Sequence, residues 1–261
     1  MNPATPLAGM HAVVTGASRG IGLAIARQLA SLGATLSLMG RDPVALAAAV
    51  QSIASATACD MHTCDVSDAD AVTCVFDAVS RAGHRTAILV NNAGVAKSAK
   101  LAATDDALWQ EMIAINLTGT FNCTRAALPQ LLLAPMGRVI NVASTAGLVG
   151  YPYVAAYCAA KHGVIGLTRA LALELAGTHV TANAVCPGYT DTGIVRDAIT
   201  NIVGKTGKTQ AQARDAIVAR NPQKRLVTPE EVASAIAWLC LPASQSINGQ
   251  AIAVDGGEMA G

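Results

Sequence analysis

Residues 11–22, His-Ala-Val-Val-Thr-Gly-Ala-Ser-Arg-Gly-Ile-Gly, decide the fold of this chain. The apolar run Ala12-Val13-Val14 predicts a buried strand, and the residues after Gly20 have the apolar spacing of a helix. Glycine in the connecting turn lets the backbone bend tightly and approach a ligand. The first turn of the helix offers unpaired N–H groups and the positive end of the helix dipole. The segment therefore predicts a strand–turn–helix unit that can hold the pyrophosphate of a dinucleotide.

Strand-like and helix-like segments alternate along the whole chain. The runs with strand character are 11–15, 35–39, 61–65, 87–91, 138–143, 180–186 and 251–254. Segments with the apolar spacing of helices lie between them at 21–32, 43–54, 68–82, 107–133, 154–176 and 229–239. This alternation predicts a parallel sheet with helices on both faces, and no linker or repeat divides residues 1–261. Asp42 and Thr228 are expected to cap helices, and Gly33 and Gly177 are expected to end them.

The composition indicates a compact globular protein. Of the 261 residues, 52% are hydrophobic and 13% are charged, and the formal net charge is +1. This balance argues against disorder and against a nucleic-acid partner. We expect no membrane segment, because no apolar run reaches about 18 residues, and no signal peptide, so a cytoplasmic location is predicted. The seven cysteines form no Cys-x-x-Cys pair, so we expect reduced, mostly buried thiols and no metal site.

A tyrosine, a lysine and a serine are the candidate catalytic groups. Tyr157 and Lys161 are four residues apart in a helical segment, so their side chains share one face. A free tyrosine has a pKa of about 10, and a nearby lysine ammonium is expected to lower it. Ser144 follows the apolar run 139–143, which places it at the carboxyl edge of a strand, where ligands bind in open α/β sheets. Together these groups suit proton transfer to a carbonyl oxygen while its carbon receives a hydride.

The chain resembles the short-chain dehydrogenase/reductase family over essentially its whole length. The motifs that carry the resemblance are Thr15-Gly-x-x-x-Gly-x-Gly22, Asn91-Asn92-Ala93-Gly94, Asn116, Ser144, Tyr157-x-x-x-Lys161, Pro187-Gly188 and Asp255-Gly256-Gly257. The resemblance implies an α/β fold: a single doubly wound Rossmann-type domain with a seven-stranded parallel sheet and a helical substrate lid over residues 190–226. It implies that Tyr157 is the general acid/base and that Ser144 polarises the carbonyl. Lys161 would lower the pKa of Tyr157 and hold the nicotinamide ribose, and Asn116 would support a water-linked proton relay to Lys161.

The resemblance also implies a set of nucleotide contacts. The residues expected to bind the cofactor are Gly16, Ser18, Arg19, Gly20, Ile21, Gly22, Arg41, Asp65, Val66, Asn92, Ala93, Gly94, Tyr157, Lys161, Pro187, Gly188, Thr190 and Thr192. Asp65 and Val66 would border the adenine, and Thr190 would lie closest to the nicotinamide carboxamide. Taken by themselves, residues 91–94 would suit a strand-ending turn and Asn116 a local backbone bond. Cys158 and His162 are interpreted as structural.

The end of the second predicted strand bears on the choice of cofactor. This strand ends in Gly40-Arg41, so the carboxylate that usually binds the ribose 2′-hydroxyl of NAD is missing. Arg41, together with Arg19 in the glycine loop, offers cationic groups suited to a 2′-phosphate. Asp42 follows one residue later and is better explained as a helix cap. We therefore expect NADP(H) to be favoured, with NAD(H) possible.

The predicted lid bears on the choice of substrate. Between Gly193 and Leu226 the sequence has seven basic and two acidic residues, a net charge of +5. A cationic lid would attract an anionic substrate, although a solvated helix face explains the same charges nearly as well. Residues 147–149, 157–163 and 221–230 are similar to 3-hydroxybutyrate and 3-hydroxyacyl-CoA dehydrogenases of the family, and the stretch around Cys186 is similar to polyketide ketoreductases. The leading hypothesis is interconversion of a 3-oxoacyl thioester, of CoA or a carrier protein, and its 3-hydroxyacyl form.

Two other functions stay open at this point. One is a general ketone or secondary-alcohol reductase of the same family, with the basic lid incidental. The other is a non-catalytic NADP-binding module, which the presence of both Tyr157 and Lys161 disfavours. The helical segments 107–133 and 154–176 carry small apolar residues on more than one face, which predicts a second burial partner. The family resemblance implies that this partner is another subunit of a homotetramer, or at least of a dimer.

Overall fold

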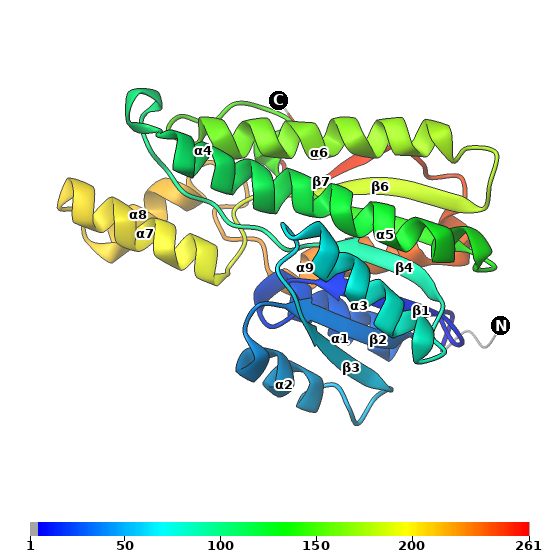
Figure 1. Ribbon diagram of the computed structural model, residues 1–261. Helices are drawn as coiled ribbons and strands as arrows, with labels where there is room; N and C mark the ends of the chain where they lie inside the picture. The colour runs from blue at the N-terminus through cyan, green and yellow to red at the C-terminus, as the bar shows by residue number, and fades with distance from the viewer. Residues whose placement is uncertain (1–4, 261) are drawn as a thin grey trace.

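The computed structural model describes residues 5–260. Its centre is one sheet of parallel strands in the order β3-β2-β1-β4-β5-β6-β7 (Figure 1). In chain order these strands are β1 (His11–Thr15), β2 (Thr35–Gly40), β3 (Cys59–Thr63), β4 (Thr86–Asn91), β5 (Gly137–Val142), β6 (Val180–Pro187) and β7 (Ala251–Val254). The predicted seven-stranded parallel sheet of the Rossmann type is confirmed.

One strand is shifted from its predicted position. The sequence pattern placed a strand at 61–65, whereas β3 covers Cys59–Thr63 and pairs Cys59 with Leu36. The chain turns directly after the strand, because the Asp65 carboxylate accepts a hydrogen bond from the Ser67 backbone N–H at 2.9 Å. This local turn competes with continued strand pairing.

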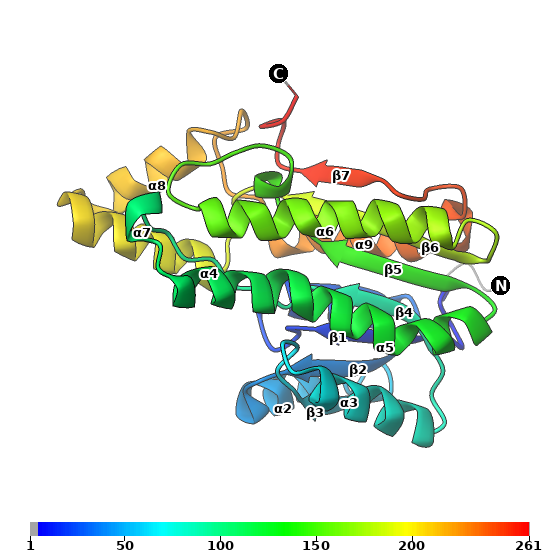
Figure 2. The ribbon, with the colours of Figure 1, turned by 45° about the horizontal axis from the view of Figure 1, so that its top comes forward.

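Helices cover both faces of the sheet. One face packs against α1 (Gly20–Ser31), α2 (Pro43–Gln51) and α9 (Pro229–Cys240). The other packs against α3 (Ala69–Arg81), α5 (Gly119–Leu133) and α6 (Ala155–Glu174), which Figure 2 shows on one side of the sheet. The predicted caps are confirmed at Asp42, which accepts from the first turn of α2, and at Thr228, which forms a capping box with Glu231. Gly33 follows α1 with a φ of 96°, a left-handed conformation that glycine adopts at low cost.

The predicted helix over 107–133 is not a single α-helix. It consists of α4 (Asp106–Ile113), a π-helical turn η2 (Ala114–Thr118) and α5. The Gly119 N–H donates to the Ala114 carbonyl five residues earlier. Asn116, at the centre of this turn, donates to the Met112 carbonyl at 2.9 Å and bonds the Val95 backbone. Apolar spacing cannot distinguish such an insertion from a regular helix, and π-turns are frequent at functional sites.

The carboxyl ends of the strands meet at one edge of the sheet. The strand order reverses between β1 and β4, which is the position where open α/β sheets bind ligands. Beyond this edge lie α7 (Gly193–Thr206) and α8 (Gln210–Val218), at the left of Figures 1 and 2. Both helices belong to the predicted lid and pack around their own small apolar cluster of Val195, Ile217 and Leu226. Three short 3₁₀ turns complete the described elements: η1 (Leu101–Ala103), η3 (Thr145–Gly147) and η4 (Pro242–Ser244).

The cysteines behave as small core residues. All seven are free thiols, and only Cys74 is exposed and Cys59 partly exposed. Between residues 5 and 260, no helix has both the length and the apolarity needed to cross a bilayer.

Candidate active site

The glycine turn after β1 packs too closely for side chains. Gly16 has a φ of 64°, and a Cβ atom there would lie 2.8 Å from the Ala93 Cα. A Cβ on Gly22 would collide with the Gly16 carbonyl and lie 2.5 Å from Asn92 Nδ2. Both positions therefore require glycine, because the backbone of the 92–93 turn fills the space a side chain would take.

A small hydrogen-bond clamp joins this turn to the end of β4. The Thr15 hydroxyl accepts from the backbone N–H groups of Asn92 and Ala93 at 3.0 and 2.9 Å. The Asn92 side-chain amide donates back to the carbonyls of Thr15 and Gly16 at 2.9 and 3.1 Å. The predicted cofactor residues Asn92, Ala93 and Gly94 thus lie beside the glycine turn. Thr15 opens the glycine motif, but its role in this clamp was not predicted from the sequence.

The start of α1 offers a site for an anion. Arg19 is the N-cap residue, and no side chain caps the first turn. The N–H groups of that turn are therefore available to a ligand, with the positive end of the helix dipole behind them. Ser18 and Ile21 flank the turn and are partly exposed, and Gly20 faces Thr192, whose Cγ2 would lie 3.4 Å from an added Cβ. This cradle fits a dinucleotide pyrophosphate.

Charged side chains lie at the ends of β2 and β3. The Arg41 guanidinium is 3.9 Å from the Asp65 carboxylate, and the two side chains are 62% and 42% exposed. Hydrogen bonds from Ser67, and then the charge of Arg41, hold the pKa of Asp65 below its usual value. Val66 is buried against Gly119 and accepts from the Asn122 side chain at 3.0 Å. An exposed pair this loose is screened by water, so Arg41 stays free to bind another anion.

Tyr157, Ser144 and Lys161 meet at the carboxyl edge of the sheet. Tyr157 and Lys161 lie on one face of α6, and the Lys161 Nζ is 5.8 Å from the centroid of the Tyr157 ring. The Ser144 hydroxyl lies near enough to Tyr157 to lower the pKa of the phenol in part. Lys161 is 4% exposed, and its ammonium donates to the Val142 carbonyl at 2.8 Å. The three residues thus lie together at this edge of the sheet.

The expected acidification of Tyr157 is not produced by these side chains. Burial raises the pKa of Tyr157 to about 12, and the nearby Ser144 hydroxyl only partly opposes this. Burial likewise lowers the pKa of Lys161 to about 8. Attraction between the two charges favours both charged forms, but the cost of desolvating each group is larger here and favours both neutral forms.

Asn116 lies next to Lys161 but its side chain is already occupied. Its Oδ1 accepts from the Val95 N–H at 3.1 Å, and its Nδ2 donates to the carbonyls of Val95 and Met112. A Cβ on Gly94 would be 2.8 Å from Asn116 Oδ1 and 3.7 Å from Lys161 Nζ, so these two residues flank the same glycine. The amide fixes the loop after β4 against the π-turn.

The loop after β6 completes the edge. Pro187 is the buried last residue of β6, and Gly188 packs against Asp255, whose Cβ would be 3.1 Å from an added Cβ. The Thr190 hydroxyl donates to the Gly188 carbonyl at 3.0 Å, and the Thr192 hydroxyl donates to the Thr190 carbonyl at 3.3 Å. The predicted nicotinamide-side residues therefore form one ordered turn at the base of the lid.

Three further residues border this edge and were not found from the sequence: Tyr151, Tyr189 and Glu258. They surround Arg220, one of the seven basic residues of the predicted lid. The Tyr151 and Tyr189 rings meet edge to face with centroids 6.3 Å apart, and Arg220 stacks on Tyr151 at 4.2 Å. Their positions depend on contacts between segments far apart in the chain, so no local pattern could have revealed them.

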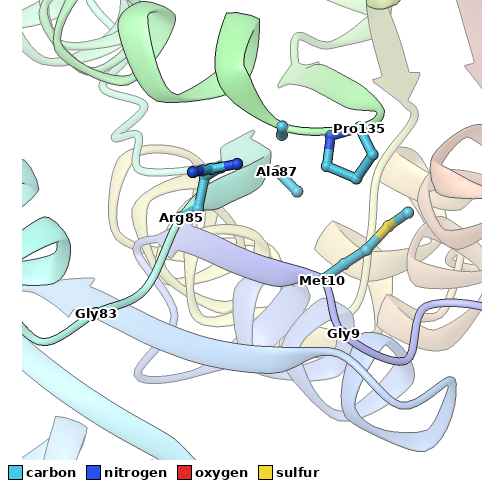
Figure 3. A pocket seen from close by; sticks show the side chains of 7 residues that line it. Gly9, Met10, Gly83, Arg85, Ala87 and Pro135 are labelled. Carbon is cyan, nitrogen blue, oxygen red and sulfur yellow. The ribbon is translucent and has the colours of Figure 1, made fainter.

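A cavity elsewhere in the protein is separate from these residues. It has a volume of about 240 Å³, and Figure 3 shows Met10 and Arg85 on opposite sides of it, with Ala87 and Pro135 at its border. These residues lie at or before the amino ends of β1, β4 and β5, at the opposite edge of the sheet. Among residues 5–260, no group of three or more His, Cys, Asp or Glu side chains could hold a metal ion.

The chain is similar to known proteins over nearly its whole length. The family model described as Enoyl-(Acyl carrier protein) reductase matches residues 16–258. D-beta-hydroxybutyrate dehydrogenase of Cupriavidus necator is 38% identical over 256 residues, which cover 97% of this chain and 99% of that protein. 2-(S)-hydroxypropyl-CoM dehydrogenase 3 of Xanthobacter autotrophicus is 38% identical over 247 residues, 94% of each chain. A crystal structure of an actinorhodin polyketide ketoreductase variant with NADPH matches with a TM-score of 0.93 and 37% identity over 98% of both chains.

Proposed function

Because this chain belongs to the short-chain dehydrogenase/reductase family, we propose that it interconverts 3-oxoacyl and 3-hydroxyacyl thioesters, with Tyr157 as the proton donor and acceptor. Family membership establishes the coarser activity, which is NAD(P)-dependent oxidation of secondary alcohols or reduction of ketones. The observation that carries the finer proposal is the meeting of Tyr157, Ser144 and Lys161 beside the glycine cradle.

Groups at the carboxyl edge of the sheet would bind each part of a nicotinamide dinucleotide. The N–H groups of the first turn of α1 would hold the pyrophosphate, and Arg41 would face the adenosine ribose. Lys161, with the turn from Pro187 to Thr192, would hold the nicotinamide half. When bound, the cofactor supplies a hydride for reduction and accepts one for oxidation.

Tyr157 carries the proton of the reaction. Since burial raises its pKa to about 12, the phenol is protonated at neutral pH. During reduction the carbonyl carbon gains a hydride, and the carbonyl oxygen takes the Tyr157 proton while the Ser144 hydroxyl donates to the same oxygen. The phenolate left on Tyr157 is stabilised by the Lys161 ammonium and then regains a proton from water. Oxidation of the alcohol runs through the same groups in reverse.

Asn116 acts in this proposal by holding the backbone rather than by exchanging protons through its side chain. Both ends of its amide are bound to the backbone of Val95 and Met112. It therefore fixes Gly94 beside the Lys161 ammonium. A water-linked relay to Lys161 would use the peptide groups of the π-turn.

The thioester substrate is supported by the lid and by the relatives. Three of the basic lid residues are engaged in ion pairs, namely Arg196 with Asp191, Arg220 with Glu258 and Arg225 with Glu231. Lys205, Lys208 and Arg214 are exposed on or between α7 and α8 and make no ion pair within the described residues. These charges would attract the phosphates of CoA or an acidic carrier protein. The relatives named for 3-hydroxybutyrate and for polyketide ketoreduction support a 3-oxo/3-hydroxy pattern in the substrate, whereas the thioester itself is argued from the lid charges.

A substrate panel tests the proposal. We expect acetoacetyl-CoA and longer 3-oxoacyl-CoAs to be reduced with a higher kcat/KM than simple ketones. The loss of NADPH absorbance measures the rate of each reaction. Raising the ionic strength should lower this preference, because it screens the lid charges. Turnover of simple ketones with no turnover of any 3-oxoacyl thioester would disprove the thioester assignment.

A general ketone reductase is the second candidate. The relative named for 2-(S)-hydroxypropyl-CoM favours it, because that alcohol is not a 3-hydroxyacyl group. The same panel decides between the two functions, since a general reductase would show no preference for thioesters.

NADP(H) is the proposed cofactor, and Arg41 is the residue that selects it. The described end of β2 offers no carboxylate of its own, while Arg41 is 62% exposed at that point. Replacing Arg41→Asp should shift the ratio of kcat/KM values toward NADH by at least tenfold, because it removes a cation from the 2′-phosphate and adds a carboxylate for a 2′-hydroxyl. An unchanged ratio would contradict the assignment.

A homotetramer is the proposed assembly. Large apolar side chains are exposed on α5 and α6, including Phe121 at 43%, Leu133 at 68% and Leu173 at 80%. Apolar helix faces of this kind favour burial against another subunit. Light scattering at micromolar concentration should give a mass near four chains, and a monomer would contradict the proposal.

A further inference from the structure

The last residues of the described chain contact both the lid and the loop after β5. The Glu258 side chain is only 4% exposed, and its Oε1 accepts from Arg220 Nε at 2.9 Å. The same oxygen accepts from the Tyr151 hydroxyl at 2.7 Å. Because that hydroxyl has one proton, the Thr145 hydroxyl, 2.9 Å away, must donate to the Tyr151 oxygen. One buried carboxylate thus connects three segments that are distant in sequence.

The first of these connections holds the lid. Arg220 follows α8, and its guanidinium lies 4.2 Å above the centroid of the Tyr151 ring. The lid is otherwise fixed mainly at its base, where Thr190 pairs with Val227 and the apolar cluster of α7 and α8 is separate from the main core. Movement of α8 away from the sheet would therefore break the Arg220–Glu258 pair. This would leave a buried carboxylate without its cation, which is costly.

The second connection leads to the catalytic turn. Thr145 directly follows Ser144 and opens the turn η3, in which the Ser144 hydroxyl accepts from the Ala146 N–H at 3.1 Å. Tyr151 holds Thr145 from the far side. The position of Ser144 therefore depends on Glu258 through Tyr151 and Thr145.

The C-terminal segment is itself held in place. The Asp255 carboxylate accepts from the backbone N–H groups of Gly257 and Met259 at 2.9 Å each. Gly256 has a φ of 66° and lies against the Asn221 side chain, where a Cβ atom would collide. Glu258 is thus presented on a fixed turn and not on a free tail.

We propose that Glu258 is a positioning residue of this enzyme. It pairs with Arg220 to hold the lid closed over the substrate, and through Tyr151 and Thr145 it aligns Ser144 with the carbonyl oxygen. The role rests on the proposed function, because it assumes that Ser144 polarises the substrate and that residues 190–226 cover it.

The test compares Glu258→Gln with a matched control. Glu258→Gln keeps the shape and one acceptor oxygen but removes the charge that binds Arg220. The control is Glu231→Gln, which neutralises the partner of another lid arginine, Arg225, at 2.6 Å. We expect Glu258→Gln to raise KM for the carbonyl substrate about tenfold, the effect of losing one charge-assisted hydrogen bond. Kd for NADPH should change less than twofold, and Glu231→Gln should leave KM unchanged.

Hydrogen exchange gives a readout that needs no substrate. Amides of α7 and α8 should exchange several-fold faster in Glu258→Gln, while those of the central strands keep their protection. Arg220→Met should reproduce both effects, and because Arg220 is 42% exposed, this variant is expected to fold. The variant that combines Glu258→Gln with Arg220→Met should show no larger change in KM or lid exchange than either single variant, since both substitutions remove the same ion pair.

A third variant separates the two connections. Tyr151→Phe keeps the ring under Arg220 but removes the hydroxyl that joins Glu258 to Thr145. We expect kcat to fall with little change in lid exchange, because Ser144 loses its support while the ion pair remains.

Several results would overturn the proposal. One is a Glu258→Gln variant in which both KM and the exchange of the lid amides are unchanged. Another is an additive change in KM when Glu258→Gln and Arg220→Met are combined. A third is a Glu231→Gln variant that changes KM and lid exchange as much as Glu258→Gln does. A parallel fall in kcat, NADPH affinity and unfolding midpoint would show a structural role only. If lid exchange and KM for a simple ketone respond as expected but no thioester is turned over, the positioning role stands and the thioester assignment fails.

Discussion

Replacing Gly22 with alanine should damage both the stability of the protein and its ability to bind a nucleotide. The added Cβ would lie 2.5 Å from Asn92 Nδ2, whereas ordinary contacts begin near 3.4 Å, and it would also meet the Gly16 carbonyl. The two sides must separate by about 1 Å, which costs about 1–3 kcal/mol of overpacking. The hydrogen bonds from Asn92 to Thr15 and Gly16 are stretched by the same movement, each adding about 1 kcal/mol. The total is about 3–5 kcal/mol.

Two measurements check this estimate. Denaturant unfolding should show the loss of stability, and fluorescence titration with NADPH should show a Kd raised at least tenfold, because the first turn of α1 moves with Gly22. Gly177→Ala is the control, since no heavy atom lies within 4 Å of an added Cβ at that position. It should leave both quantities unchanged. A Gly22→Ala protein with a wild-type midpoint and Kd would show that the turn has room for a side chain at this position.

Two predictions concern pH. Burial lowers the pKa of Lys161 to about 8. The value of kcat/KM for ketone reduction should therefore be constant below about pH 7 and fall above pH 8 as the ammonium is lost. A Lys161→Arg variant whose kcat/KM still falls at the same pH would contradict this. Burial, with the neighbouring His84, lowers the pKa of His11 to about 4, against about 6.5 in the unfolded chain. Between pH 6.5 and pH 4, His11 is therefore protonated in the unfolded chain but neutral in the folded protein. The free energy of unfolding should decrease by about 3 kcal/mol as the pH falls from 6.5 to 4. Urea unfolding across this range checks it, and a His11→Gln variant with the same slope would show that another group titrates.

Much of the sheet could be predicted from the sequence because its determinants are local. The apolar runs at 11–15 and 251–254 predicted the bounds of β1 and β7. Asp42 and Thr228 indicated the starts of α2 and α9, because both are residue types that cap helices. The candidate catalytic residues were recognisable because their spacing along one helix and their place after a strand fix where they point.

The remaining features depend on interactions that a linear pattern does not encode. The π-turn at Asn116 is stabilised by the Val95 backbone, twenty-one residues away. The pKa values of Tyr157 and Lys161 reflect burial by the whole fold, which reverses the shift expected from the lysine alone. Glu258 meets Tyr151 and Arg220 only because the chain brings its end back to the sheet.

Substitution of Tyr157 by phenylalanine is the sharpest test of the proposed proton transfer. We expect kcat for ketone reduction to fall by about 10²–10⁴, the usual contribution of a positioned proton donor, while Kd for NADPH stays within twofold of wild type. If a Tyr157→Phe enzyme binds NADPH normally and keeps a kcat within threefold of wild type, Tyr157 is not the proton donor.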